Sequence, residues 1–173
     1  EAREEAAVPS MAVASSTVSM PSASSALSIE DIIESVTDPE LLEIFLEEAL
    51  EISEQAAELF HQLQGAGAKE NLSRELSEML RYLHTLKGGA RLSGLVTLGD
   101  YVHHLESIYE KVEKYFSEVF LANALFLARA HDGLQDAVLA LKNEGAVRID
   151  REIYQLLLRL AKNPLVPIEE KSL

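Results

Sequence analysis

The chain has 173 residues, 47% of them hydrophobic, which is enough for one domain with a core and a tail. Twenty-nine acidic residues against fifteen basic ones give a net charge of −14, which argues against nucleic acid or an anionic membrane as a partner. Cysteine is absent, which excludes disulfides and thiolate chemistry, and no apolar run reaches the roughly 18 residues that span a bilayer, so we expect a soluble, cytoplasmic domain.

Residues 1–27 are rich in alanine, serine and proline. They contain too few large apolar side chains to offset the entropy lost on ordering, so we expect a disordered interdomain linker. Such a linker suggests that the sequence is a segment of a longer protein. A natural disordered tail or a cloning remnant is the alternative interpretation.

The first structured segment that we expect is a short helix over residues 28–36, with Ser28 as its N-cap and Asp31 in the capping-box position. Asp38 and Pro39 then predict the start of a long helix that ends near residues 64–67. Its apolar positions recur at spacings of three and four, at Leu42, Phe45, Ala49, Ile52, Ala56, Leu59 and Leu63.

Three further amphipathic helices follow with the same spacing. The second has Leu72, Leu76, Met79, Leu83, Leu86 and Ala90 inward, and the third has Leu98, Val102, Leu105, Tyr109 and Val112. The fourth has Asn123, Leu127, Ala130, Leu134, Ala137 and Leu141 inward.

A shorter helix, capped by Asp150 and stopped at Asn163 and Pro164, ends the domain. Its inward positions are Ile153, Leu156, Leu157 and Leu160. No segment shows convincing strand alternation. We therefore predict an all-α fold, an antiparallel four-helix bundle with this additional C-terminal helix, over residues 28–163, followed by a tail over residues 164–173.

His84 lies about 120° from the centre of the apolar stripe of its helix, so it should lie on a flank and be partly exposed. Arg81, Lys87 and Arg91 are three residues before, three after and seven after it, which makes a cationic strip on an acidic protein. This strip favours an anion as the ligand. A lone histidine on a helix flank is most often a surface residue, which is our interpretation of His61 and His131.

Gly88 and Gly89 follow Lys87 directly, and Gly88 lies on the same face as His84. Two glycines inside a helix cost about 2 kcal/mol relative to alanine. Access explains this cost, because a second protein could then approach the imidazole closely. The alternative is that the helix ends at Lys87 and Gly88 forms a left-handed C-cap.

His103 and Glu106 form a polar patch on the next helix, at the boundary where adjacent helices meet, so Glu106 could reach His84. A carboxylate that accepts a hydrogen bond from one imidazole nitrogen leaves the other nitrogen free as a nucleophile. The alternative interpretation is an ordinary solvated face made by His103, His104 and Glu106.

The segment LHTLKGGARLSGLVTLGDYVHHLE resembles the histidine phosphotransfer (HPt) domain, in particular that of CheA-type chemotaxis kinases. The motif positions match at His84, Lys87, Gly88, Gly94, Leu98, His103 and Glu106. The segment DPELLEIFLEEALEISEQAAELF resembles the first helix of such domains in the multi-HPt hybrid kinases of type IV pilus (twitching-motility) chemosensory systems.

The resemblance implies a phosphorelay carrier in two-component signalling. His84 would accept a phosphoryl group from the catalytic domain of a histidine kinase and pass it to the aspartate of a response-regulator receiver domain. Lys87 and Arg91 would offset negative charge, Glu106 would orient the imidazole and His103 would assist. Partner docking would involve Arg81, Gly88, Gly89 and Arg91. ATP and magnesium would be bound by partner domains, so this domain would need no cofactor and would be a carrier, itself part of a histidine kinase.

Two other classes compete with this interpretation. A metal-binding bundle would use His84, His103, His104 and Glu106, but di-iron bundles need Glu-x-x-His on two helices, and we expect no metal. The second alternative is a phosphorylation-inactive helical bundle that only docks a partner.

Overall fold

A computed structural model describes residues 31–36, 38–65 and 71–169 of the chain. Its elements in chain order are β1 (Ile32–Ser35), α1 (Pro39–Gly65), α2 (Leu72–Leu92), α3 (Val96–Val112), η1 (Phe116–Phe120), η2 (Leu121–Asn123), α4 (Ala124–Glu144), β2 (Ala146–Ile149) and α5 (Arg151–Lys162). The linker expected over residues 1–27, the cap expected at Ser28 and the last residues of the tail lie outside the described residues.

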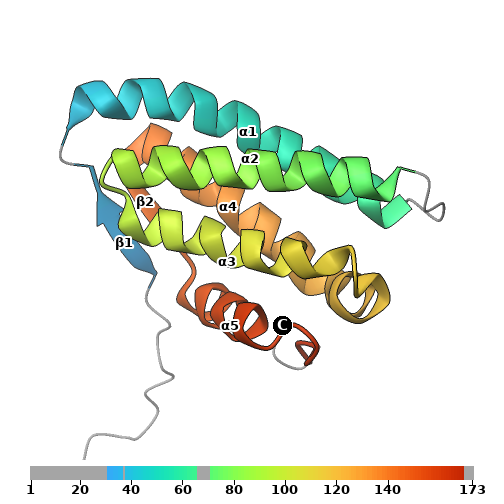
Figure 1. Cartoon of the computed structure of the whole chain (residues 1–173). Coiled ribbons are helices and arrows are strands. Elements are labelled where there is room, and N and C mark those ends of the chain that lie inside the picture. Colours follow the sequence, from blue (N-terminus) through green and yellow to red (C-terminus); the bar gives the residue numbers. More distant parts are fainter. Residues whose placement is uncertain (1–30, 37, 66–70, 170–173) are drawn as a thin grey trace, which may run out of the picture.

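The long helices α1 to α4 form the predicted antiparallel bundle (Figure 1). Helix α1 packs on α2 and α4, α2 packs on α3, and α5 covers the outer side of α3. The predicted inward positions of these four helices are buried, except that Leu42 and Leu72 are only partly buried. The fold class and the helical stripes are therefore confirmed.

The first helix begins where the sequence predicts. The Asp38 carboxylate accepts a hydrogen bond from the Glu40 N–H at 3.0 Å, which satisfies one of the free donors at the start of α1. The predicted cap of α5 is also present, because Asp150 Oδ1 accepts from the Ile153 N–H at 3.0 Å. In α5, Leu157 and Leu160 are buried, whereas Ile153 and Leu156 are half-buried.

The short helix predicted over residues 28–36 is wrong, and so is the expectation that the chain has no strand. Residues Ile32–Ser35 form β1, which pairs antiparallel with β2, with Ile32 opposite Ile149 and Ser35 opposite Ala146. The physical reason is the partner strand. The side chains of Val147 and Ile149 are buried against the bundle, and the backbone N–H and C=O groups of β2 pair with those of β1. Because β2 is far from β1 in the chain, the residues around β1 do not indicate that a partner strand exists.

The connection between α3 and α4 is longer than a simple bundle turn. A π-helical turn and a 3-10 turn occupy residues 116–123, and Asn123 is buried at their end. Its side chain donates to the Val119 carbonyl at 2.8 Å and accepts from the Ile168 N–H at 2.9 Å. The chain after α5 thus returns to the bundle, where Ile168 is buried.

The interpretation of His131 as a surface residue is wrong. His131 is buried on α4, and its Nε2 lies 2.7 Å from the Tyr109 hydroxyl. Its ring packs against Phe60 with centroids 5.1 Å apart. Tyr109 on α3 supplies the hydrogen-bond partner of Nε2, and the sequence around His131 gives no sign of it. His61 is exposed, as expected.

Candidate functional site

Helix α2 continues through Lys87, Gly88 and Gly89 and ends at Leu92, so the interpretation of Gly88 as a C-cap is wrong. The glycine that ends the helix is Gly94, whose φ of 77° is left-handed. The Leu95 N–H bonds the Ala90 carbonyl at 2.8 Å across this turn, which is the hydrogen-bond pattern of a Schellman C-cap. The turn sends α3 back along α2, which brings Glu106 beside His84.

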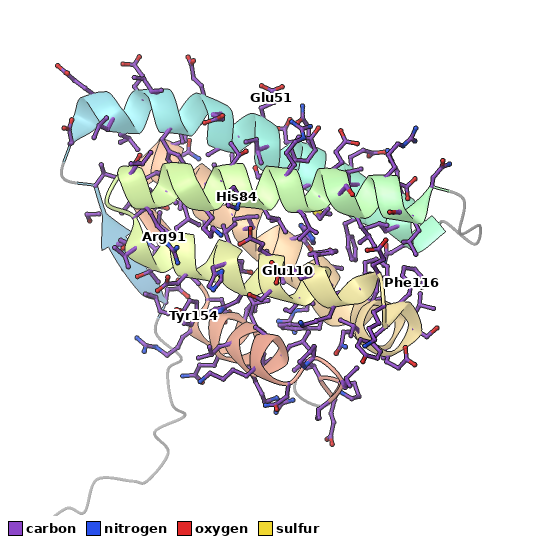
Figure 2. All side chains as sticks on the ribbon, viewed as in Figure 1. Glu51, His84, Arg91, Glu110, Phe116 and Tyr154 are labelled. Atoms are coloured by element: carbon purple, nitrogen blue, oxygen red, sulfur yellow. The ribbon has the colours of Figure 1, made fainter. Side chains whose placement is uncertain are left out.

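His84 lies on the outer face of α2, over the boundary between α2 and α3 (Figure 2). Its side chain is 74% exposed, as the helical period predicts. The Nδ1 atom lies 2.9 Å from Glu106 Oε1. The contact between these two residues, predicted from the register of two helices, is therefore confirmed.

Glu106 is the buried centre of this group, and it binds through both carboxylate oxygens. Its Oε2 accepts from Lys87 Nζ at 2.5 Å and lies 3.5 Å from His103 Nδ1. Burial acts to raise the pKa of Glu106, but the hydrogen bonds from Lys87, His84 and His103 outweigh burial and lower that pKa. The carboxylate is therefore ionised at neutral pH.

The ionised carboxylate determines which imidazole nitrogen is free. A carboxylate can only accept hydrogen bonds, so Nδ1 of His84 carries the proton and donates a hydrogen bond to Glu106. In the neutral imidazole, Nε2 then keeps its lone pair. Because most of the His84 side chain is exposed, a second protein can reach this lone pair.

The two glycines of α2 have different surroundings. A Cβ built at Gly88 would meet nothing within 4 Å, so the surface beside His84 is open there. A Cβ built at Gly89 would lie 2.9 Å from Cδ2 of Phe45, which is buried on α1. Gly88 therefore lies on the open face, whereas Gly89 allows α1 to pack closely on α2.

The arginines of the predicted cationic strip already have partners. Arg91 Nη2 lies 3.1 Å from Asp100 Oδ1, and Arg81 Nη2 lies 3.6 Å from Glu78 Oε1. Arg81 also lies over the ring of Tyr82, with Cζ 4.7 Å from the centroid. Of the three cations in the strip, Lys87 is the one that contacts Glu106.

Sequence reasoning missed Asp100 as the partner of Arg91. The Arg91 side chain also covers Gly99, where a Cβ would lie 2.8 Å from Arg91 Cγ. His104 is not part of the site, because its ring turns toward Tyr154 of α5, with centroids 5.8 Å apart. In residues 31–36, 38–65 and 71–169, no three or more His, Asp or Glu side chains are grouped so that they could hold a metal ion.

The family of the chain follows from its match to a family model. The model of the Hpt domain matches residues 40–144, more than half of the 173 residues. The chain belongs to the Hpt domain family. The match covers α1 to α4, including His84, Lys87 and Glu106, and leaves out β1, β2 and α5.

Hpt domains carry out histidine phosphotransfer in two-component signalling and pair with kinases and receiver domains. No curated protein and no solved structure matches the chain. In the part of the chain that the structure describes, none of the helices has the length and apolar character needed to cross a membrane.

Proposed function

We propose that His84 is the phosphoacceptor of this Hpt domain and that Nε2 is the reacting atom. The observation that carries this proposal is the bond from Nδ1 of the exposed His84 to the buried carboxylate of Glu106. That bond fixes the ring orientation and leaves Nε2 unprotonated and open to solvent. The domain is then a carrier that is phosphorylated by one partner and dephosphorylated by another.

In the first step, the Nε2 lone pair attacks the γ-phosphorus of ATP held by a kinase domain. The bond between the γ-phosphorus and the bridging oxygen breaks, and ADP leaves with that electron pair. The ring gains positive charge, which the Glu106 carboxylate offsets through Nδ1. In the second step, an aspartate oxygen of a receiver domain attacks the phosphorus, and the electron pair of the N–P bond returns to Nε2.

Lys87 offsets the negative charges of Glu106 and of the phosphoryl group during transfer. Its Nζ neutralises Glu106, and it lies one helical turn from His84, where a phosphoryl group adds negative charge. Gly88 leaves the adjacent surface open to the partner domain. Arg91 and Arg81 lie further along the same helix, where they can meet acidic side chains of a partner, and His103 supports Glu106 from α3.

The cellular setting that we propose is a CheA-type chemosensory kinase, of the multi-HPt kind that controls type IV pili and twitching motility. The resemblance of residues 38–60 and 83–106 to such domains supports it. The partners would be an ATP-binding histidine-kinase domain, which also holds magnesium, and a receiver domain, all in the cytoplasm.

A phosphotransfer assay tests the proposed function. The full chain is incubated with candidate CheA-type kinase domains and radiolabelled ATP, and then with a receiver domain. We expect an acid-labile label on the wild type and none on His84→Gln, with unchanged circular dichroism. His61→Gln is the matched control, since His61 is also exposed on a helix, and it should keep the label.

Label that persists in His84→Gln would show that another residue is the acceptor. The competing function is a phosphorylation-inactive docking module. It would be favoured if the wild type bound a receiver domain but acquired no label from any kinase domain that phosphorylates other Hpt domains.

A further inference from the structure

Glu34 on β1 binds the start of α3, although the two segments are far apart in the chain. Its Oε1 and Oε2 accept from the Thr97 N–H at 2.9 and 3.0 Å, and Oε2 also accepts from the Leu98 N–H at 3.2 Å. These residues are separated by 63 and 64 positions. The carboxylate thus caps a helix on another element.

Helix α3 has no cap of its own. Its N-cap residue, Leu95, makes no side-chain hydrogen bond, and its first turn contains no acidic residue. The first N–H groups of a helix need acceptors, and a negative charge there is favourable to the helix dipole. Glu34 supplies both the acceptors and the charge. Pairing of β1 with β2, with Glu34 opposite Val147, holds the carboxylate in place.

The turn that Glu34 caps is followed directly by the residues that hold Arg91. The Arg91 stem lies across Gly99, where a Cβ would be 2.8 Å from its Cγ. Its guanidinium bonds Asp100 at 3.1 Å. Figure 2 shows Arg91 near the start of α3, on the same side of the bundle as His84. Because Gly99 and Asp100 hold its side chain, the position of Arg91 depends on the first turn of α3.

We propose that Glu34 is a positioning residue, which acts through the first turn of α3 to hold Arg91 in place for partner docking. The proposal rests on the proposed function, because it assumes that the face with His84 receives the partner domain. It adds β1, which lies outside the residues matched by the family model, to the elements that build this face.

The proposal predicts a specific kinetic effect. Arg91 bonds Asp100, whereas Glu106 bonds His84 and Lys87, so Arg91 stands outside the group that orients the imidazole. Loss of Glu34 should therefore weaken docking and leave the chemistry of His84 unchanged. In the kinase reaction, KM for the chain should rise about three- to tenfold in Glu34→Ala, and less in Glu34→Gln, with kcat within about twofold.

The matched control removes a different helix cap. Asp38→Ala takes away the acceptor of the Glu40 N–H at the start of α1. Helix α1 contains neither Arg91 nor the residues of α3 that hold it. The Asp38→Ala variant should lower stability to urea by a similar amount and leave KM unchanged. The double variant Glu34→Ala/Arg91→Ala should have the same KM as Arg91→Ala, because both substitutions remove the same docking contact, the one made by Arg91.

A second measurement does not depend on phosphorylation. The NMR signal of the Arg91 Nε–H group should shift or broaden in Glu34→Ala and stay in place in Asp38→Ala. An unmoved Arg91 signal in Glu34→Ala overturns the proposal whatever the kinase assay gives, and so does a KM in the double variant that multiplies the two single effects. A wild type that takes no label at His84 would instead overturn the proposed function, while the Arg91 signal would still decide whether Glu34 positions it.

Discussion

His84 and Glu106 are 22 residues apart on two different helices, yet Nδ1 and Oε1 lie 2.9 Å apart. One partner is exposed and the other is buried, with side-chain exposures of 74% and 9%. This asymmetry suits a residue that must react with other proteins while its orientation is controlled from within. Removing this bond changes the orientation of the His84 ring but leaves the nucleophilic nitrogen in the protein, so the two contributions can be measured separately.

Substitution of Glu106 should slow phosphorylation of His84 without abolishing it, because the nucleophile and Lys87 remain. Loss of a hydrogen bond to a charged group corresponds to a rate decrease of roughly ten- to a hundredfold. Glu106→Gln keeps the shape and one acceptor but not the charge, so its rate should fall between those of the wild type and Glu106→Ala. The initial rate of labelling measures the effect.

The ¹⁵N chemical shifts of the His84 ring provide the independent check on Glu106. In the wild type, they should show a protonated Nδ1 and an unprotonated Nε2, and in Glu106→Ala the two tautomers should mix. If the ring shifts were the same in both proteins, Glu106 would not be the residue that orients His84.

Lys87 should contribute to stability as well as to transfer, because it neutralises a buried carboxylate. Lys87→Met leaves Glu106 without its main cationic partner and should lower the free energy of unfolding by roughly 1–3 kcal/mol, measured by urea denaturation. Adding Glu106→Gln removes the unpaired charge and should recover part of that loss. A double variant that is no more stable than Lys87→Met would show that the loss does not come from the unpaired charge of Glu106.

Much of this site follows from helical periodicity alone. The stripe of Leu83, Leu86 and Ala90 predicts that α2 continues past Gly88, and it also places His84 on a flank. The stripe on α3 places Glu106 at the helix boundary. Each of these inferences needs only the angle between residues of one helix, which is a local property.

The features that the sequence did not predict depend on residues distant in the chain. β1 pairs with β2, although all four bundle helices lie between them in the chain, and the strand-forming residues Ile32 and Ile33 also suit an amphipathic helix. His131 is buried against Phe60 of α1 and the Tyr109 hydroxyl of α3, two residues far from it in the chain. Asp100 and Gly99 hold Arg91 only after α2 and α3 have packed. No pattern within one segment contains this information.

Gly88 and Gly89 should respond in opposite ways to the same substitution. Gly88→Ala meets nothing within 4 Å and should raise the free energy of unfolding by about 1 kcal/mol, since alanine is the better helix former. Gly89→Ala places a Cβ 2.9 Å from Phe45 and should destabilise the domain by about 1–3 kcal/mol through overpacking. Urea denaturation measures both values.

The rate of phosphorylation should show the reverse order: among folded proteins, the Gly88 variants should be slow and Gly89→Ala should be close to the wild type. Gly88→Ala should slow phosphorylation, and Gly88→Leu should slow it more, because both narrow the open surface beside His84. Gly89→Ala should be labelled at close to the wild-type rate under conditions where it is folded. A Gly88→Leu variant that is stable and fully active would show that the open surface is not needed for docking.

The last prediction concerns pH and the buried His131. Burial, with a smaller effect from the charge of His61, lowers the pKa of His131 to about 4, whereas its unfolded value is about 6.5. Between these two pH values, the unfolded chain binds more protons than the folded protein. The contribution of neutral His131 to stability is therefore fully present above about pH 6.5 and is lost as the pH falls toward 4.

Between pH 7 and pH 5, this difference amounts to roughly 2 kcal/mol of unfolding free energy. The double variant His131→Leu/Tyr109→Phe removes the titrating group and its hydroxyl partner together, so it leaves no unpaired donor in the core. Urea denaturation at pH 7 and pH 5 should then show a smaller loss for the double variant than for the wild type, with His61→Gln remaining close to the wild type. Equal losses in the wild type and the double variant would mean that His131 takes up its proton in the folded protein, and hence that the core around Phe60 and Tyr109 opens to water in mild acid.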